Sequence, residues 1–199
     1  NLNTLRLDGT QISDISEVAQ MTNLEVFTAA NSEISDLSAL TNLTKLEYIT
    51  VPNTKITSID ALSNNNLSSL ISINLEGNGL TDVSALKKIP TLKTITLSSN
   101  TISDLSFLTS ITAPENLYLD NNEIENIDVI YTLSTLKELD VSSNWIDIPL
   151  DFADAMYTNN ANLVLLKYDN QTVKVLADII VDTAGSNHFA LTINGENDG

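Results

Sequence analysis

Residues 92–111 read LKTITLSSNTISDLSFLTSI, and this stretch carries the pattern that decides the fold. Its apolar positions return in register along the chain at intervals of about 22 residues, a period typical of repeat architectures. The three clearest sets are Leu92, Ile95, Leu97, Ile102, Leu105, Leu108 and Ile111; Leu24, Phe27, Ala29, Ile34, Leu37, Leu40 and Leu43; and Leu2, Leu5, Leu7, Ile12, Ile15, Val18 and Met21. A chain that repeats at this period stacks similar coils, and each coil buries the apolar side of its neighbour.

The repeats open on a short L-x-x-L-x-L core with an Asn three places on, which is the signature of leucine-rich repeats. Strand segments begin near Leu2, Leu24, Leu46, Leu70, Leu92, Pro114 and Leu136, and only the step from Leu46 to Leu70 is longer than the others, by two. The two extra residues fall in the polar cluster 63–66, which predicts a bulging loop. The sequence therefore predicts an α/β repeat fold: a right-handed leucine-rich repeat solenoid with short parallel concave strands and 3₁₀ or irregular convex turns.

The second half of each repeat carries an aspartate before an apolar residue, as in Ser103-Asp104-Leu105-Ser106. Such a carboxylate can accept backbone N–H bonds at the start of a tight helical turn. With so few residues available, a 3₁₀ turn is favoured over a full α-helix. These aspartates are therefore predicted to cap turns and not to catalyse a reaction.

The position eight after each first leucine is small and polar. It holds Thr10, Ser32, Thr54, Asn78, Asn100, Asn122 and Asn144. Buried amides need hydrogen-bond partners, so the four asparagines predict a ladder that satisfies backbone groups of the turns. Threonine and serine offer fewer donors, which predicts a less stable N-terminal end. Pro114 at a first-leucine position and Ala29 at a core position are two predicted weak points.

The repeats predict a solenoid domain over residues 1–157, with about seven coils of which the last is atypical. Phe152, Ala153 and Met156 stand at helical spacing near its end, in an apolar group predicted to lie over the last coil. Residues 158–199 are predicted to form a short β-rich C-terminal segment, with strands at 163–166, 172–181 and 188–193.

The 22-residue period, the Asp-capped turns and the Asn at the strand exit resemble the internalin-like leucine-rich repeat surface proteins of bacteria. Asp169-Asn170-Gln171-Thr172-Val173 resembles the start of the immunoglobulin-like segment that follows the repeats in that family. The family's N-terminal helical cap is missing, and too few residues follow 158 for a full sandwich. The chain opens directly on a repeat, which indicates a piece of a longer protein.

The resemblance implies a non-enzymatic protein–protein interaction module of a secreted or cell-surface protein, attached to the wall through regions outside this chain. It also implies adhesion or binding of a protein partner through the concave face. Two alternatives stay open. One is a structural spacer or stalk, and the other is an intracellular regulatory scaffold resembling phosphatase regulatory subunits with the same period. Those scaffolds are rich in Lys and Glu, whereas this chain has few lysines and many Ser and Thr.

The chain carries 26 acidic and 9 basic residues, a net charge of −17. This balance argues against nucleic acid, whose phosphates require Lys and Arg, and against anionic membrane surfaces. No apolar run approaches the roughly 20 residues of a membrane helix, so no membrane insertion is expected. The absence of cysteine excludes disulfides and thiolate metal sites.

The sequence predicts no catalytic, cofactor-binding or metal site, and hence no enzyme. The sole histidine, His188, has no carboxylate near it in the sequence and no second His or Cys to join it in a zinc site or a nucleophilic pair. No nucleophile elbow, phosphate-binding glycine loop or EF-hand spacing occurs.

The outward strand positions contain Arg6, Val26, Tyr48, Asn74 and Tyr118 among residues that are mostly Thr, Ser, Asn and acids. Aromatic side chains and arginine dominate the binding energy of protein interfaces. We therefore predict that a protein partner contacts these five residues, with a contiguous patch around Tyr48, Asn74 and Tyr118.

Overall fold

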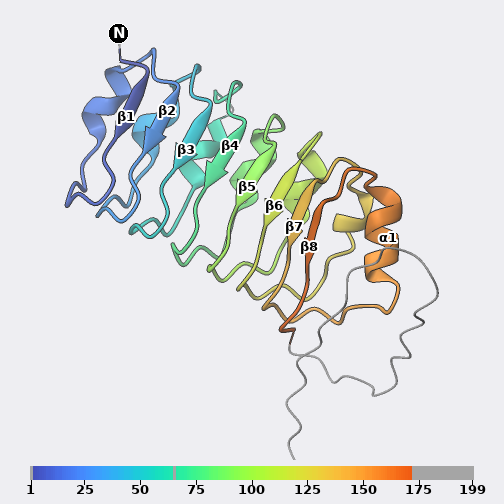
Figure 1. Cartoon of the computed structure of the whole chain (residues 1–199). Coiled ribbons are helices and arrows are strands. Elements are labelled where there is room, and N and C mark those ends of the chain that lie inside the picture. Colours follow the sequence, from blue (N-terminus) through green and yellow to red (C-terminus); the bar gives the residue numbers. More distant parts are fainter. Residues whose placement is uncertain (1, 65, 172–199) are drawn as a thin grey trace, which may run out of the picture.

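The computed structural model describes residues 2–64 and 66–171, in which eight three-residue strands alternate with short helical turns. The strands are β1 (Thr4–Arg6), β2 (Val26–Thr28), β3 (Tyr48–Thr50), β4 (Ser72–Asn74), β5 (Thr94–Thr96), β6 (Asn116–Tyr118), β7 (Glu138–Asp140) and β8 (Leu165–Lys167). They form one sheet in chain order (Figure 1), and every neighbouring pair is parallel. The predicted solenoid is confirmed.

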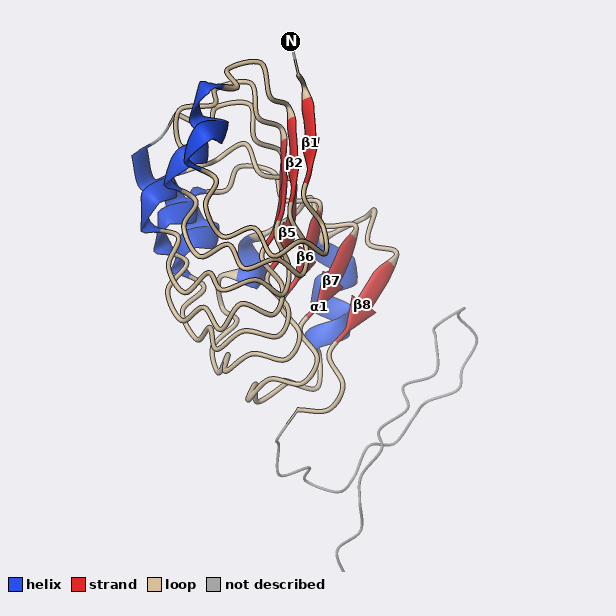
Figure 2. Cartoon of the chain, turned by 90° about the vertical axis from the view of Figure 1, so that its left-hand side faces the viewer, coloured by secondary structure: helices blue, strands red, loops and turns tan. Residues whose placement is uncertain are grey.

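In the same part of the chain, six 3₁₀ turns form the opposite side of the solenoid from the sheet (Figure 2). They are η1 (Ser16–Gln20), η2 (Ser38–Leu40), η3 (Asp60–Asn64), η4 (Ser84–Lys88), η5 (Ser106–Ser110) and η6 (Ile130–Thr132), and the α-helix α1 (Phe152–Asn159) follows. We call the solvent-exposed side of the sheet the sheet face, and the side formed by the turns the turn face. The core lies between them.

Alternation along each strand places its central residue in the core. Phe27, Ile49 and Ile73 occupy this position in β2, β3 and β4, and all are fully buried. Ala29 is also fully buried in the coil of Phe27. The longer step between β3 and β4 does not disturb the sheet, because Tyr48 still pairs with Ser72.

The predicted asparagine ladder is confirmed. Asn100 is 7% exposed, and its side-chain oxygen accepts the backbone N–H groups of Asn78 at 3.2 Å and Leu80 at 2.9 Å. Its side-chain nitrogen donates to the backbone carbonyls of Leu75, Leu97 and Ser98. One amide thus ties its own turn to the coil before it. Thr10 and Ser32, by contrast, donate only to the carbonyl three residues back in their own turns.

Each coil leaves its strand through a residue in the left-handed backbone region. These residues are Gly9, Asn31, Asn53, Gly77, Ser99, Asn121, Ser143 and Asn170, with φ between 53° and 67°. Glycine and asparagine adopt this conformation readily, whereas other residues incur a steric cost of about 1–2 kcal/mol. Ser99 and Ser143 therefore hold strain that the other coils avoid.

We expect Ser143→Gly to stabilise the protein by about 0.5–1 kcal/mol, because glycine removes the clash of Cβ at φ 54°. Urea unfolding measures the change. Ser103→Gly is the matched control: Ser103 has no positive φ, so glycine there should destabilise the protein. Equal effects at both positions would show that Ser143 is not strained.

The aspartates cap the turns as predicted. Asp14, Asp82 and Asp104 each accept the backbone N–H of the serine two residues on, at 2.7–2.8 Å. These backbone hydrogen bonds, aided by the serine hydroxyls, lower the pKa of each carboxyl below its usual value. A lowered pKa in the folded state means that the stabilisation is present at neutral pH and is lost as the pH falls through that pKa.

The apolar group predicted to lie over the last coil forms helix α1, with Phe152 and Met156 fully buried, but the helix belongs to the coil between β7 and β8 and a further strand follows it. The Phe152 ring makes edge contacts with Tyr131 and Tyr168, at centroid distances of 5.8 and 5.2 Å. Phe152 therefore joins the end of coil six to the last described coil.

Strand β8 corrects the count of seven coils. Residues 163–166 were expected to start a separate segment, yet Leu165–Lys167 pair in parallel with β7. Gln171 continues the ladder, because its side-chain oxygen accepts the N–H of Asn144 at 3.1 Å. The 22-residue period did not predict β8, because α1 lengthens the coil before it.

The domain boundary at 157/158 and the immunoglobulin-like start stay predictions. The strands expected at 172–181 and 188–193 lie outside the described residues, as does His188.

Candidate protein-binding face

The sheet face presents two columns of side chains, because the first and third residues of each strand point away from the core. From β1 to β8, the first column is Thr4, Val26, Tyr48, Ser72, Thr94, Asn116, Glu138 and Leu165. The second column is Arg6, Thr28, Thr50, Asn74, Thr96, Tyr118, Asp140 and Lys167. All five predicted contact residues lie in these columns.

The structure brings some of the predicted residues together and separates others. Val26 and Tyr48 are direct cross-strand neighbours in the first column, and Arg6 lies at the start of the second. Asn74 and Tyr118 share the second column, with Thr96 of β5 between them. The patch around Tyr48, Asn74 and Tyr118 thus spans β3 to β6, about 14 Å at the usual strand spacing. Its strands are not all adjacent, because β5 lies between β4 and β6.

The two tyrosines of the patch differ in what they offer a partner. Tyr48 is 40% exposed, whereas Tyr118 is partly buried and its hydroxyl donates to the carboxylate of Glu138. Burial first, and then the hydrogen bond to Glu138, raise the pKa of Tyr118 to about 12. Tyr48 therefore presents an available ring and hydroxyl, and Tyr118 presents mainly its ring.

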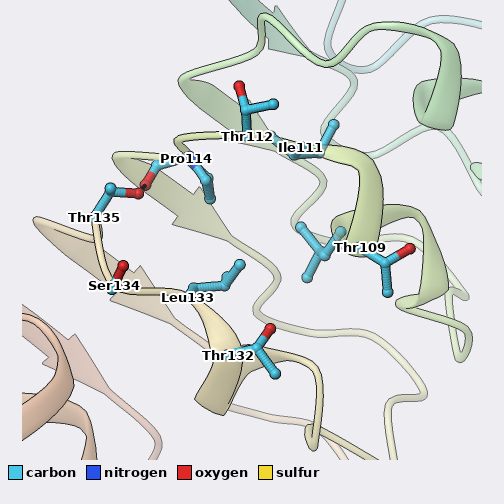
Figure 3. A pocket seen from close by; sticks show the side chains of 9 residues that line it. Thr109, Ile111, Thr112, Pro114, Thr132, Leu133, Ser134 and Thr135 are labelled. Atoms are coloured by element: carbon cyan, nitrogen blue, oxygen red, sulfur yellow. Dashed lines mark hydrogen bonds between the residues drawn. The ribbon is translucent and has the colours of Figure 1, made fainter.

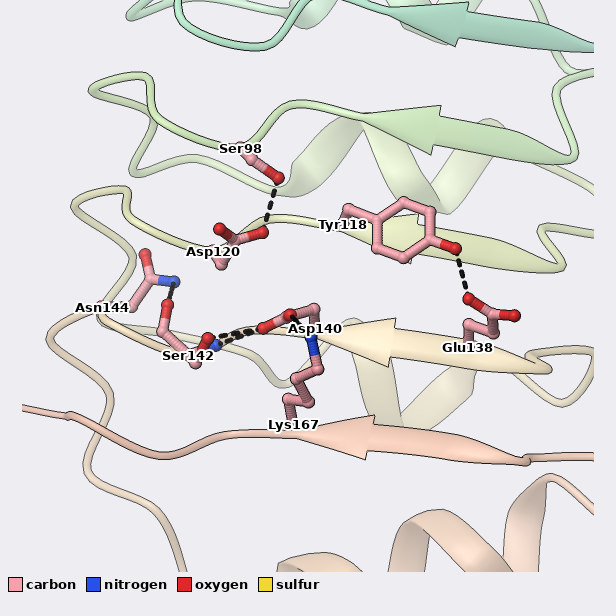
Figure 4. A network of polar contacts seen from close by, with 8 residues as sticks. All are labelled: Ser98, Tyr118, Asp120, Glu138, Asp140, Ser142, Asn144 and Lys167. Atoms are coloured by element: carbon pink, nitrogen blue, oxygen red, sulfur yellow. Dashed lines mark hydrogen bonds and ion pairs between the residues drawn. The ribbon is translucent and has the colours of Figure 1, made fainter. Parts of the chain in front are cut away.

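A polar network follows Tyr118 toward the C-terminal end of the sheet face (Figure 4). Ser98 donates to Asp120 at 2.5 Å, and Asp140, which is 5% exposed, accepts from the Ser142 hydroxyl at 2.6 Å and from the Lys167 ammonium at 3.0 Å. The sequence reasoning missed this network. The regular spacing of Ser98 and Asp120, one repeat apart, was a usable signal, but Lys167 was expected to lie outside the solenoid.

A second charged group lies beside the first column. Glu115 receives the ammonium groups of Lys93 at 3.0 Å and Lys137 at 2.5 Å, and these bonds lower the pKa of its carboxyl. Lys93 and Lys137 thus share one carboxylate and Lys167 binds Asp140, whereas Arg6, Glu47 and Glu76 have no ion pair with any described residue. The ion pairs of this face therefore leave charges of both signs unpaired.

Within residues 2–64 and 66–171, no group of three or more His, Cys, Asp or Glu side chains is arranged to hold a metal ion. In the same part of the chain, no helix has the length and apolar character needed to cross a membrane.

We expect Glu138→Gln to lower the pKa of Tyr118 below its value of about 12. A carboxylate favours the protonated phenol that donates to it, and a neutral amide does so less. The pKa should stay above 10, the ordinary value for tyrosine, because burial is the larger cause and persists. Carbon-13 NMR of labelled tyrosine rings measures the titration. Glu123→Gln serves as a control and should leave the pKa of Tyr118 unchanged.

A family model described as leucine rich repeat matches residues 44–102. The internalin InlF of Listeria monocytogenes superposes on this chain with a TM-score of 0.76 at 32% sequence identity. The matched region covers 85% of this chain and 48% of the InlF chain. Internalin C2 of the same species gives a TM-score of 0.77 at 23% sequence identity, and the matched region covers 88% of this chain and 74% of the internalin C2 chain. None of the curated proteins matches the chain in sequence.

A leucine-rich repeat protein of Leptospira interrogans gives a TM-score of 0.75 at 20% identity, covering 85% of this chain and 43% of its own. This likeness and that to internalin C2 show the fold alone. The chain spans about half the length of InlF.

Proposed function

We propose that this chain, which is a leucine-rich repeat protein with structural similarity to Listeria internalins, is a non-enzymatic module that binds a protein partner through its sheet face. We further propose that it belongs to a secreted or cell-surface protein of a bacterium. The second proposal follows from the likeness to InlF, and its attachment to the surface would lie in regions outside this chain.

The observation that carries the binding proposal is the exposed Tyr48 beside Val26 on a sheet face whose other positions are mostly polar. A large aromatic ring among small polar neighbours is typical of the residues that dominate interface energies. Short Ser, Thr and Asn side chains in β4 and β5 leave the ring of Tyr118 accessible from the same direction. Glu47 precedes Tyr48 and Glu76 follows Asn74 by two residues, and these two unpaired carboxylates favour a partner whose contacting surface is polar and basic.

We expect Tyr48→Ser combined with Tyr118→Ser to weaken partner binding at least tenfold, as the loss of two aromatic contacts does at a typical interface. The partner is first found by pull-down of candidate extracellular proteins with the repeats, and binding is then measured by surface plasmon resonance. Tyr157→Ser is the matched control, since Tyr157 is 42% exposed but lies on α1, away from the sheet face.

Circular dichroism must first show that the variants fold. Undiminished binding by the double variant would exclude the predicted contacts at Tyr48 and Tyr118. A loss of binding in the Tyr157 control alone would place the contact at the C-terminal end of the solenoid.

The alternative function is a spacer that holds another domain away from a surface. The continuous sheet and the asparagine ladder support it, because both join each coil to the next along the described solenoid. A spacer would tolerate the double tyrosine replacement, but deletion of one whole coil would change the reach of the attached domain.

A further inference from the structure

A cavity of about 190 Å³ opens on the turn face between η5 and η6 (Figure 3), and its described lining of Thr, Ser, Leu, Ile and Pro residues holds no charged group that would select a ligand. A chemically reactive pair lies elsewhere, at Asn78–Gly79, where coil four leaves the sheet. Asparagine amides are thermolabile. An asparagine followed by glycine is especially reactive, because no side chain shields the glycine nitrogen from the amide carbon.

The backbone nitrogen of Gly79 is accessible in the folded protein. In coils two, three, five, six and seven the residue at this position donates its N–H to a carbonyl of the coil before it, at 2.8–3.1 Å; these donors are Glu33, Lys55, Thr101, Glu123 and Trp145. Gly79 makes no such bond with any described residue, and it is exposed to solvent. Base can therefore reach the Gly79 N–H without a change of fold.

The side-chain amide of Asn78, by contrast, is buried and held at both ends. Asn78 is 7% exposed, and its Oδ1 accepts the backbone N–H of Thr54 at 3.1 Å and the Thr54 hydroxyl at 2.6 Å. Its Nδ2 donates to the backbone carbonyls of Val51, Leu75 and Glu76, at 2.9, 2.9 and 3.2 Å. The amide carbon cannot turn toward the next backbone nitrogen until these bonds break.

We propose that Asn78–Gly79 is a site of spontaneous modification that the folded ladder protects and that local opening of coil four exposes. Once the Asn78 side chain is released, the Gly79 nitrogen loses its proton to base and bonds to Cγ of Asn78. The bond from Cγ to Nδ2 breaks, and Nδ2 takes up a proton and leaves as ammonia. Water then opens the resulting succinimide ring at either carbonyl, which leaves aspartate or isoaspartate at position 78.

Neither product fits the ladder. The side chain of aspartate has no N–H donor, and it would set a buried carboxylate against the backbone carbonyls that Asn78 now binds. Isoaspartate adds a methylene group to the main chain, which shifts the ladder position relative to its partners. An opening of coil four therefore becomes irreversible once the reaction has occurred. This inference concerns the ladder, so it does not rest on the proposed binding function of the sheet face.

The test incubates the full chain at mildly alkaline pH, in native buffer and in urea, and follows position 78 by peptide mapping that separates aspartate from isoaspartate. Conversion should be at least tenfold slower in native buffer than in urea. Asn194–Gly195 provides the reference for the chemistry, and in urea it should convert within twofold of the rate of Asn78. Asn100–Thr101, a ladder pair without glycine, should convert at least tenfold more slowly than Asn78 in urea.

Hydrogen exchange followed by NMR tests the accessible nitrogen separately. The protection factor of the Gly79 amide should be at least tenfold below that of Thr101, whose N–H donates to Leu80 at 2.9 Å. Equal protection at the two positions would show that the Gly79 nitrogen is not free in the folded protein.

Variants connect the reaction to the opening of coil four. Asn100→Ala removes the oxygen that accepts the N–H groups of Asn78 and Leu80, so it should speed native conversion at least fivefold and leave the rate in urea unchanged. Asn23→Ala, at an exposed position, is the control and should change neither rate. If Asn100→Ala does not fold by circular dichroism, Thr54→Val replaces it. That variant removes only the hydroxyl bonded to Asn78, and it should speed native conversion at least twofold.

Three further results would overturn the proposal. Equal rates in native buffer and in urea would show that the ladder gives no protection. Conversion of Asn194 in urea without conversion of Asn78 would show that the Asn78–Gly79 pair is not reactive. An Asn78→Asp variant with the denaturant midpoint of the parent would show that the product fits the ladder, so that opening stays reversible.

Discussion

Asn100→Ala is expected to lower the free energy of unfolding by about 3 kcal/mol, the upper part of the range for leaving buried polar groups unpaired. The replacement orphans the buried N–H groups of Asn78 and Leu80 at once. It also removes the donors to three backbone carbonyls, and alanine offers no substitute for either set. Chemical denaturation followed by circular dichroism measures the effect.

Asn23→Ala is the control for this prediction. Asn23 is exposed, and its side-chain oxygen accepts only from Lys45, at 2.7 Å. A change below about 0.5 kcal/mol is expected there, as for most surface positions. If Asn100→Ala left the denaturant midpoint unchanged, the ladder would have no measurable part in stability.

Phe152→Ala is expected to cost about 3–5 kcal/mol, the range for removing a buried aromatic ring. The ring is fully buried and contacts both Tyr131 and Tyr168, so its loss opens a cavity under the last coil. In a solenoid each coil contacts only its neighbours. The damage should therefore be confined to the C-terminal coils.

Hydrogen exchange read by mass spectrometry tests where that damage falls. Amides of β7, β8 and α1 should lose protection, while those of β1 to β4 should keep it. Tyr157→Ala, an exposed position on the same helix, should change neither region. Loss of protection along the whole chain would mean that the solenoid unfolds as one unit, contrary to this expectation.

The strand register, the ladder and the turn caps could be predicted because each depends on spacing within one repeat. Asn78, Asn100 and Asn122 stand at the same place in successive repeats, so one count locates all three. Burial then follows, since the coils stack in register. The prediction needed no knowledge of contacts between distant parts of the chain.

Apart from the contact of Ser98 with Asp120, the features that were missed depend on contacts that spacing does not encode. Lys167 reaches Asp140 only because α1 occupies the coil between them and β8 still joins the sheet. The exposure of Tyr48 followed from alternation, whereas the anchoring of Tyr118 by Glu138 required the pairing of β6 with β7.

The ladder also bears on how such a chain can change its length over generations. The oxygen of Asn100 binds N–H groups of the coil before it, and the oxygen of Asn122 does the same for the coil of Asn100. Recombination that removed residues 92–113 would leave Asn122 to meet Asn78 in the place of Asn100. Whole coils between Asn78 and Asn144 are therefore exchangeable units, and the distance between the two ends can evolve in steps of one strand spacing, about 4.8 Å. The coil of Thr54 is not exchangeable in this way. The Thr54 hydroxyl contacts the backbone of its own turn and the side chain of Asn78, and it cannot replace an asparagine amide that also binds the coil before it.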